Sequence, residues 1–390
     1  MTEWNNWREE NPNVEIWLQG ADLSNAHLER GNLVGAYMQK AVLSRARLKR
    51  GELQYAHLER AYLWDAHLEE ANLAETHLAS ALLDRVHLER ANLAGAQLEE
   101  AVLNRARLTR AELRYAHLEK ARLLDADLRG ADLRDARLEG VDLKRAHLEE
   151  AKLSYAHLEN AYLSHAHTRR AVFDHAHLGA AVLISSNLEG ASFITTIVDG
   201  LTLFWECTVD QATDFRGVGL ETCRIDEPTK YLLKYNRRRM NCEDWYKQHP
   251  RFAWPVKAFF WMSDYGRSTG RIIFTFFGLA LIFAGIYYIC ALVSSCGIVS
   301  NLFEGKEGPV PGWLVPFRTI YFSIVTMTTL GFGDMHANCQ SFWGHFLLTV
   351  QVILGYVLLA ALVTRIGVLF TSGVIAGEFK DSSRKSGNNE

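Results

Sequence analysis

The residues best suited to chemistry form a short glycine-containing segment, T-M-T-T-L-G-F-G-D, which begins at Thr326. Gly331 and Gly333 alternate with larger residues, and glycine adopts positive φ angles without a steric cost. A backbone of alternating conformation directs successive carbonyl oxygens toward one axis, where they replace the hydration shell of a desolvated cation. Such an irregular backbone is tolerated at membrane depth only where protein and a wet pore surround it. The segment therefore has the conformational freedom that coordination of a cation by the main chain requires.

Histidines form a second candidate group. Ten of the 15 histidines lie just before a position of a five-residue repeat, at spacings that are multiples of ten. Such rows suggest metal binding or pH sensing, because stacked imidazoles repel one another when protonated. Arg47, Gln97 and Arg107 interrupt the rows, so we interpret them as a solvated polar ladder rather than a ligand set. The ten are His27, His57, His67, His77, His87, His117, His147, His157, His167 and His177.

Other combinations of reactive residues carry less information. Cys207, Cys223, Cys242 and His249 lack a paired C-x2-C spacing, which argues against a zinc site and favours free thiols of a reducing compartment. Nothing in the chain assembles a nucleophile, a base and an orienting group, so we do not expect an enzyme or a cofactor. The 42 basic and 45 acidic residues form no dominant basic face, which argues against a nucleic-acid partner.

Two apolar segments flank the glycine-containing segment and must position it. Residues 272–294 and 342–364 comprise 23 residues each without a formal charge, long enough to span a bilayer. His345 and Gln351 are the most polar residues of the second segment. Cations precede the first segment and follow the second, with only Lys306 and Arg318 between them. The positive-inside rule then predicts a multi-pass protein of the cell membrane, in contact with lipid, with both termini in the cytoplasm.

The segment between the spans resembles the pore of prokaryotic two-transmembrane pore-loop potassium channels. A helix-like stretch, Arg318–Met327, leads into T-T-L-G-F-G-D. The resemblance implies an α-helical membrane pore domain with two transmembrane helices, a pore helix and a filter loop, and K⁺ as the permeant ion. Because one loop cannot encircle an ion, it also implies a homotetramer. The implied filter residues are Thr329, Leu330, Gly331, Phe332 and Gly333, where the first four bind K⁺ through their carbonyls; Thr326, Thr328 and Asp334 support the filter.

Three positions refine this resemblance. Phe332 replaces the commoner tyrosine, and Val325 stands where some bacterial members have a glutamate beside the filter aspartate. Both departures concern slow filter inactivation rather than K⁺ selectivity. Gly355 lies where these channels have the gating hinge of the inner helix, and its alternative role is a close helix–helix contact. The sequence contains no nucleotide-binding fingerprint, EF-hand or arginine-rich voltage sensor that would identify the gating stimulus.

The first half of the chain is a five-residue repeat. Of the 38 positions spaced by five from Leu18 to Leu203, 33 are leucine, and alanine usually lies two residues earlier. A period of five fits neither a helix nor a strand. The pattern resembles the pentapeptide-repeat family, which implies a right-handed quadrilateral β-helix with four pentads per coil. The 38 pentads then form about nine coils and a rod of roughly 45 Å, with the aromatic N-terminal segment as a cap.

One outward row of this solenoid is largely apolar. Eight positions spaced by 20 fall on one face, and six of them are apolar. A row of exposed apolar side chains marks an interface, and the alternative is neutral drift. Arg122 and Asp142 interrupt the row. The candidate interface residues are Val42, Tyr62, Leu82, Val102, Tyr162 and Val182.

Residues 206–270 break the five-residue register and combine aromatic side chains with cations, as in Trp245, Tyr246, Lys247 and Arg251. This composition favours a helix in the lipid interface, and the alternative is a helix packed on the end of the solenoid. Cys296 and Cys339 lie on the outer side, either paired or as thiols. The predicted segments are a cap (1–17), a cytoplasmic solenoid (18–205), a linker (206–270), a first transmembrane helix (271–295), an extracellular turret (296–317), a pore helix and filter (318–335), a second transmembrane helix (341–372) and a cytoplasmic tail (373–390).

Together these features predict a potassium-selective channel that is regulated or assembled through a cytoplasmic pentapeptide-repeat domain. A first alternative is a weakly selective cation channel with the same pore. A second is a membrane-anchored scaffold whose solenoid binds a cytoplasmic protein partner, which the sequence does not identify.

Overall fold

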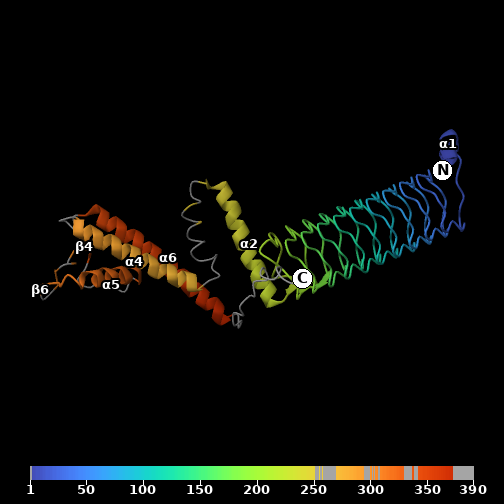
Figure 1. Cartoon of the computed structure of the whole chain (residues 1–390). Coiled ribbons are helices and arrows are strands. Elements are labelled where there is room, and N and C mark those ends of the chain that lie inside the picture. Colours follow the sequence, from blue (N-terminus) through green and yellow to red (C-terminus); the bar gives the residue numbers. More distant parts are fainter. Residues whose placement is uncertain are drawn as a thin grey trace, which may run out of the picture. The chain divides into compact units, whose positions relative to one another are not determined.

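The computed structural model describes residues 2–250, 254, 257, 269–293, 299–300, 302, 304–305, 308–328, 336–337 and 341–371. The chain forms two compact units, Met1–Glu243 and Asp244–Glu390. The first unit is a stack of coils, and the second contains the two apolar helices (Figure 1).

Each coil of the first unit contains four pentads. Parallel bridges join residues 20 apart, for example Val42 to Tyr62 and Tyr62 to Leu82. The Val42 amide donates to the Ala21 carbonyl at 2.9 Å, and the Leu43 amide donates to the Tyr62 carbonyl at 2.7 Å. Each coil is thus bonded to the coils before and after it. The predicted quadrilateral β-helix is confirmed.

The five-residue period follows from the turn at each corner. The Ala46 amide donates to the Leu43 carbonyl at 3.0 Å, which closes a four-residue turn. Its third residue, Arg45, has φ = 59°, and positive φ recurs at this place in most pentads. A turn of this kind requires positive φ at its third residue. The leucine and alanine of each pentad then face inward; Leu98 and Ala96, for example, are fully buried.

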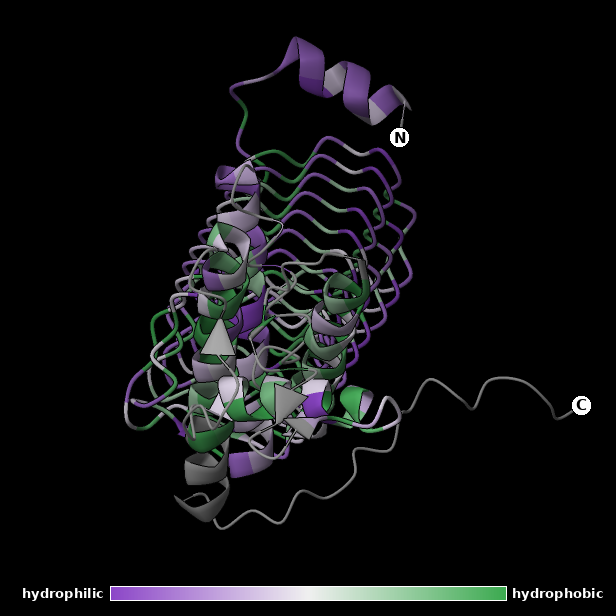
Figure 2. Cartoon of the chain, turned by 90° about the vertical axis from the view of Figure 1, so that its left-hand side faces the viewer, coloured by the Kyte–Doolittle hydropathy of each residue, from purple (hydrophilic) through white to green (hydrophobic). Residues whose placement is uncertain are grey.

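Helix α1 (Thr2–Glu10) covers the first coils. The Trp4 indole donates to the Asn32 carbonyl at 3.0 Å, and the Asn5 side chain exchanges hydrogen bonds with Arg30 and Asn32. These bonds satisfy edge groups of the first coils, as a cap must. The helix is hydrophilic along most of its length (Figure 2).

The coil stack extends beyond residue 205, so the predicted boundary at that residue is wrong. Strands β1 (Val182–Ile184), β2 (Leu203–Trp205) and β3 (Arg224–Ile225) form a parallel sheet in the order β1-β2-β3. Val182 pairs with Leu203, and Leu203 pairs with Arg224, so these pairings span 21 residues instead of 20, and Ser192 pairs with Asp214 across 22. The additional residues break the sequence register and leave the stacking intact.

Helix α2 (Glu227–Gln248) follows the last coil and lies within the predicted linker. Leu233 and Asn236 are buried, and the Asn236 amide donates to the carbonyls of Asp210 and Thr213 at 2.6 and 3.0 Å. This part of the predicted linker therefore packs on the end of the solenoid. Most of the predicted interfacial aromatic segment lies outside the described residues, although Trp254 is 80% exposed.

The second unit has three main helices: α4 (Thr269–Val293), α5 (Val315–Thr328) and α6 (Phe342–Thr371). Helices α4 and α6 contain apolar spans of mean hydropathy 2.3 and 2.5, long enough to cross a membrane. Short strands β4 (Val299–Ser300) and β7 (His336–Ala337) pair antiparallel, as do β5 (Glu304–Gly305) and β6 (Gly308–Pro309). Helix α5 begins three residues before the predicted start of the pore helix.

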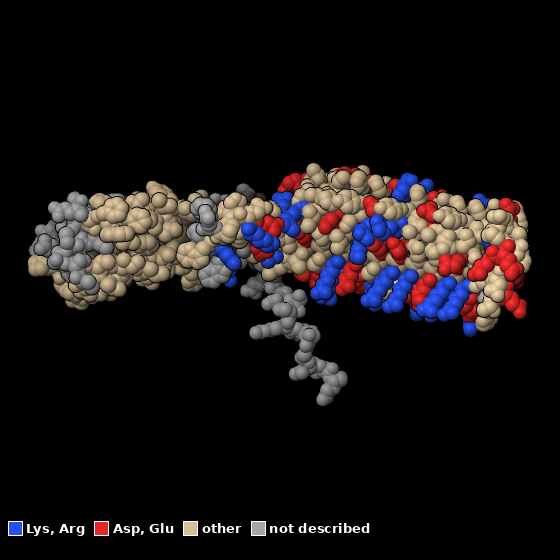
Figure 3. All heavy atoms as spheres, turned by 90° about the horizontal axis from the view of Figure 1, so that it is seen from above, with Lys and Arg blue, Asp and Glu red and all other residues tan. Residues whose placement is uncertain are grey.

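The two units differ in the charged residues on their surfaces. Lysine, arginine, aspartate and glutamate cover the coil stack, whereas the described part of the second unit is largely free of them (Figure 3). Phe274, Leu281 and Ile289 of α4 are exposed apolar side chains. An exposed apolar surface on long helices is what lipid contact requires.

Candidate functional site

The predicted filter, Thr329–Gly333, and Asp334 lie outside the described residues. The chain reaches this segment from the end of α5 at Thr328 and leaves it toward β7, which begins at His336. Coordination of K⁺ by the carbonyls of Thr329, Leu330, Gly331 and Phe332 therefore stays a prediction. The described residues define what surrounds this segment.

The two predicted support residues on α5 differ in their surroundings. The Thr328 hydroxyl donates within its own helix, to the Ile324 carbonyl at 2.9 Å. Thr326 is buried, and its hydroxyl oxygen has no hydrogen-bond partner among the described residues. Helix α5 has no basic residue in its last turn. The partial negative charge of its C-terminal end is therefore not neutralised by a side chain of that turn, and it favours a nearby cation.

Gly355 of α6 is in close contact with the end of α5. A Cβ atom at this position would lie 2.2 Å from the Met327 carbonyl oxygen and 2.8 Å from the Met327 Cα. Only a residue without a side chain permits this approach. The geometry supports the close-contact role for Gly355, and its role as a hinge stays a prediction.

The pore-loop resemblance assigned no role to three buried polar residues of this unit. Gln351 of α6 contacts Tyr287 of α4 and Ser323 of α5 through hydrogen bonds of 2.6 to 3.0 Å. The available signal was a polar residue inside an apolar span. Sequence alone did not indicate its partners, which lie 64 and 28 positions away.

The apolar row of the solenoid forms as predicted. Bridges join consecutive members of the row from Val42 to Val182, with Arg122 and Asp142 in the expected places. Tyr62, Leu82 and Tyr162 are 46%, 37% and 45% exposed, respectively. Whether this row is an interface stays a prediction.

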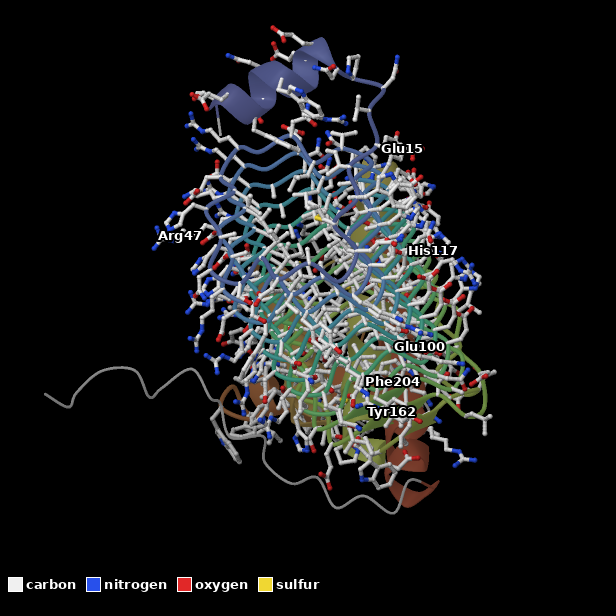
Figure 4. All side chains as sticks on the ribbon, turned by 90° about the vertical axis from the view of Figure 1, so that its right-hand side faces the viewer. Glu15, Arg47, Glu100, His117, Tyr162 and Phe204 are labelled. Atoms are coloured by element: carbon white, nitrogen blue, oxygen red, sulfur yellow. The ribbon has the colours of Figure 1, made fainter. Side chains whose placement is uncertain are left out.

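The histidine rows form stacks between adjacent coils. The rings of His57 and His77, and those of His67 and His87, have centroids 4.5 Å apart. Arg47 and His117, from the two rows, lie on opposite sides of the solenoid (Figure 4). Burial, together with the charge of the neighbouring His67, lowers the pKa of His87.

Several histidine pairs have a carboxylate within reach, so a metal ion is the relevant alternative. His57 with Glu59 and His77 is one such group. Its rings are stacked within 7° of parallel, and lone pairs that lie in parallel planes do not converge on one ion. The group of His157, Glu159 and His177 is closer to the geometry of a metal site. Its rings are tilted by 35°, and Glu159 lies 3.5 and 3.4 Å from the two Nδ1 atoms.

The cysteines of the predicted linker are spread over the last coils and α2. Burial raises the pKa of Cys207 to about 12, and its thiol donates to the Leu183 carbonyl. Cys223 is also buried. A thiol with a raised pKa is a poor metal ligand, in agreement with the absence of a zinc motif. Cys296 and Cys339 lie outside the described residues.

Comparisons with known proteins divide the chain in the same way. A family model described as pentapeptide repeats matches in eight copies between residues 18 and 167, and a model described as ion channel matches residues 275–372. No match was found among curated proteins.

Three solved structures are similar to the first part of the chain. HetL, a pentapeptide repeat protein involved in heterocyst differentiation regulation from the cyanobacterium Nostoc sp. strain PCC 7120, is 31% identical; the match covers 55% of this chain and 96% of HetL (TM-score 0.36). QnrB1, a plasmid-mediated fluoroquinolone resistance protein, is 14% identical; the match covers 56% of this chain and 94% of QnrB1 (TM-score 0.38). Rfr23, a pentapeptide repeat protein from the cyanobacterium Cyanothece 51142, is 26% identical; the match covers 45% of this chain and 100% of Rfr23 (TM-score 0.12).

Proposed function

The chain is a pentapeptide-repeat protein joined to a pore-loop ion-channel domain, and from this premise we propose that it is a potassium-selective channel. Four chains assemble around one axis, and K⁺ passes down its gradient through the filter that they share. The observation that carries the proposal is the segment from Thr326 to Asp334, which begins in the last turn of α5, continues beyond its end and lies between two apolar helices in the sequence.

The proposed mechanism uses the main-chain oxygens of the filter, and the Thr329 hydroxyl closes its inner site. A K⁺ ion that leaves water is coordinated by carbonyls of Thr329 to Phe332 from each of four chains, which replace its hydration shell. Gly331 and Gly333 permit the positive φ angles that this arrangement needs. The negative end of each α5 dipole, at Thr328, adds a favourable potential for a cation. The inner helices, α6, gate the pore near Gly355.

Membrane orientation and regulation complete the proposal. The protein lies in the cell membrane with both termini and the solenoid in the cytoplasm, because the cations flank the spans on that side. The solenoid regulates or assembles the pore through its outer surface, since an interior filled with leucine and alanine leaves no cavity for a ligand.

Purified protein in planar bilayers with opposed K⁺ and Na⁺ gradients tests this function. A potassium-selective channel has a reversal potential near the K⁺ equilibrium potential. A reversal potential near zero indicates the weakly selective cation channel instead. Protein that inserts into liposomes and gives no ion flux favours the membrane-anchored scaffold.

The filter assignment predicts that Gly331→Ala abolishes K⁺ current while tetramers remain intact in detergent. The added Cβ disfavours the positive φ that directs a carbonyl to the ion. Gly278→Ala in α4 is the matched control, because its added Cβ would have no described atom from outside its own helix turn within 4 Å. Undiminished K⁺-selective flux through the Gly331 variant would remove the filter assignment.

A further inference from the structure

A chain of buried hydrogen bonds joins helices α4, α5 and α6 of the second unit, which is called the membrane unit below. The Tyr287 hydroxyl of α4 donates to Gln351 Oε1 of α6 at 2.6 Å. The Gln351 amide nitrogen donates to the carbonyl and the hydroxyl of Ser323 of α5, at 3.0 and 2.6 Å. The Ser323 hydroxyl donates to the Ala280 carbonyl of α4 at 2.6 Å. One amide side chain therefore connects α4, α5 and α6.

Each group in this chain of bonds has one consistent role. The Ser323 carbonyl can only accept, so the nitrogen of the Gln351 amide must face it, and Oε1 must face Tyr287. The Tyr287 hydroxyl is then a donor. The Ser323 hydroxyl accepts from Gln351 and donates to Ala280. All three side chains are at most 1% exposed, so water does not compete for these bonds.

The surroundings of the network are otherwise apolar. The Tyr287 ring meets Phe322 edge-on with centroids 5.4 Å apart, and Phe283, Leu347 and Leu354 belong to the same cluster. A buried glutamine in place of an apolar residue is costly unless it is fully hydrogen-bonded, and polar residues inside spans mark functional positions.

The network acts at a defined place on α5. Gln351 and Gly355 lie one turn apart on α6, and their partners Ser323 and Met327 lie one turn apart on α5. Helix α6 thus holds α5 at two successive turns, the second of them next to its end at Thr328. Because a helix is stiff and rises about 1.5 Å per residue, the position of Ser323 determines where Thr328 presents the following segment.

We propose that Tyr287, Gln351 and Ser323 are positioning residues that hold α5, and thereby the filter entrance at Thr329, in the conducting geometry. This inference rests on the proposed function. The bond from Gln351 holds α5 from the side that faces the other two helices. Val325 of α5 has no polar group that could hold the filter through a bond to Asp334.

Single-channel recording of two variants tests the proposal. Tyr287→Phe removes only the hydroxyl and keeps the ring against Phe322. Gln351→Leu removes the central amide at similar volume. The control is Tyr288→Phe, a neighbouring residue on α4 whose hydroxyl makes no hydrogen bond to any described residue. The measurements are the K⁺/Na⁺ permeability ratio, the mean open time and the tetramer population in detergent.

We expect Tyr287→Phe and Gln351→Leu to lower the permeability ratio or the mean open time by about three- to tenfold, the factor for one lost buried hydrogen bond. Tetramers should persist, and the double variant should match Gln351→Leu alone, because both changes break one network. Tyr288→Phe should behave as wild type. If Gln351→Leu fails to assemble, Tyr287→Phe still provides the test.

Two outcomes overturn the positioning role. In the first, Tyr287→Phe and any assembled Gln351→Leu keep the wild-type ratio and open time. In the second, the control variant changes both as much as Tyr287→Phe does. A wild-type reversal potential near zero instead contradicts potassium selectivity, and the mean open time then still tests the positioning role.

Discussion

Buried hydroxyls show how differently the coil stack and the membrane unit are built. In the stack, Thr76 occupies an alanine position and donates to the Leu53 carbonyl, 23 residues earlier. Ser186 and Thr196 repeat this bond at the same offset. In the membrane unit, Ser323 instead bonds to residues of two other helices. The stack reuses one local contact, whereas the membrane unit depends on contacts that occur once.

This difference predicts how each region tolerates change. A coil contacts only its neighbours, so a substitution in the stack has local consequences. Phe173 and Phe193 replace leucine in successive coils and stack at 4.7 Å, which shows that the interior accommodates larger residues. In the membrane unit, Gly355 approaches the backbone of Met327 more closely than any other described glycine approaches a backbone atom. Single residues there should control function.

A large effect is expected for substitutions of Gly355, of which Gly355→Ala is the first. The added Cβ would meet the backbone of Met327 at 2.2 Å, so α5 or α6 must shift. Overpacking of this kind costs about 1–3 kcal/mol, and we expect at least about a fivefold loss of K⁺ flux in liposomes. Gly285→Ala is the matched control, because the described residues beyond its own helix turn place no atom within 4 Å of the added Cβ.

Gly355→Pro separates contact from hinge. A hinge would be kinked toward an open inner helix by proline, and open probability would rise. A close contact would be lost, and flux would fall further than in Gly355→Ala. Wild-type flux in both variants would contradict both roles and place the gate elsewhere.

A moderate effect is expected when Tyr62, Leu82 and Tyr162 are all replaced by lysine. These side chains point outward, so circular dichroism should show an intact stack. If the row is an interface, the tetramer population in detergent or the open probability of the channel should change by about fivefold, as for a lost contact of about 1 kcal/mol. The control replaces three tyrosines of another row by lysine: Tyr55, Tyr115 and Tyr155, which are 54–60% exposed. Equal behaviour of both triple variants would indicate drift.

The smallest effect is expected for His87→Asn. Because burial and His67 lower the pKa of His87, the unfolded chain binds more protons below pH about 6.5. Stability is therefore lost as pH falls through this value; Glu69 and Glu89 oppose the shift, and Arg107 adds to it. The decrease in Tm between pH about 7.5 and about 5.5 should be smaller in the variant than in wild type.

The control for the pH experiment is His27→Asn, on the same row, with a side chain that is 67% exposed. Its pH-dependent decrease in Tm should match that of wild type. An unchanged decrease in His87→Asn would show that stacked histidines do not couple folding to pH, and that the row is a solvated ladder only.

The sequence by itself determined the features that repeat or that follow from composition. A fixed offset of 20 residues places each coil on the next, so leucines at every fifth position were sufficient to predict the β-helix and its outward row. Two uncharged segments were likewise sufficient to predict the long apolar helices, because bilayer thickness sets their length. The candidate filter segment was visible because glycine spacing is a local property of the chain.

Tertiary structure alone decided the contacts that occur once. The last coils have one or two additional residues, and parallel pairing of β2 with β3 maintains the stack where the sequence pattern is lost. Gln351 was visible as a polar residue, yet its partners Tyr287 and Ser323 come from two other helices. The approach of Gly355 to Met327 likewise depends on how α5 and α6 pack. Periodicity encodes contacts at constant separation, and contacts between unique positions are fixed only when the helices pack together.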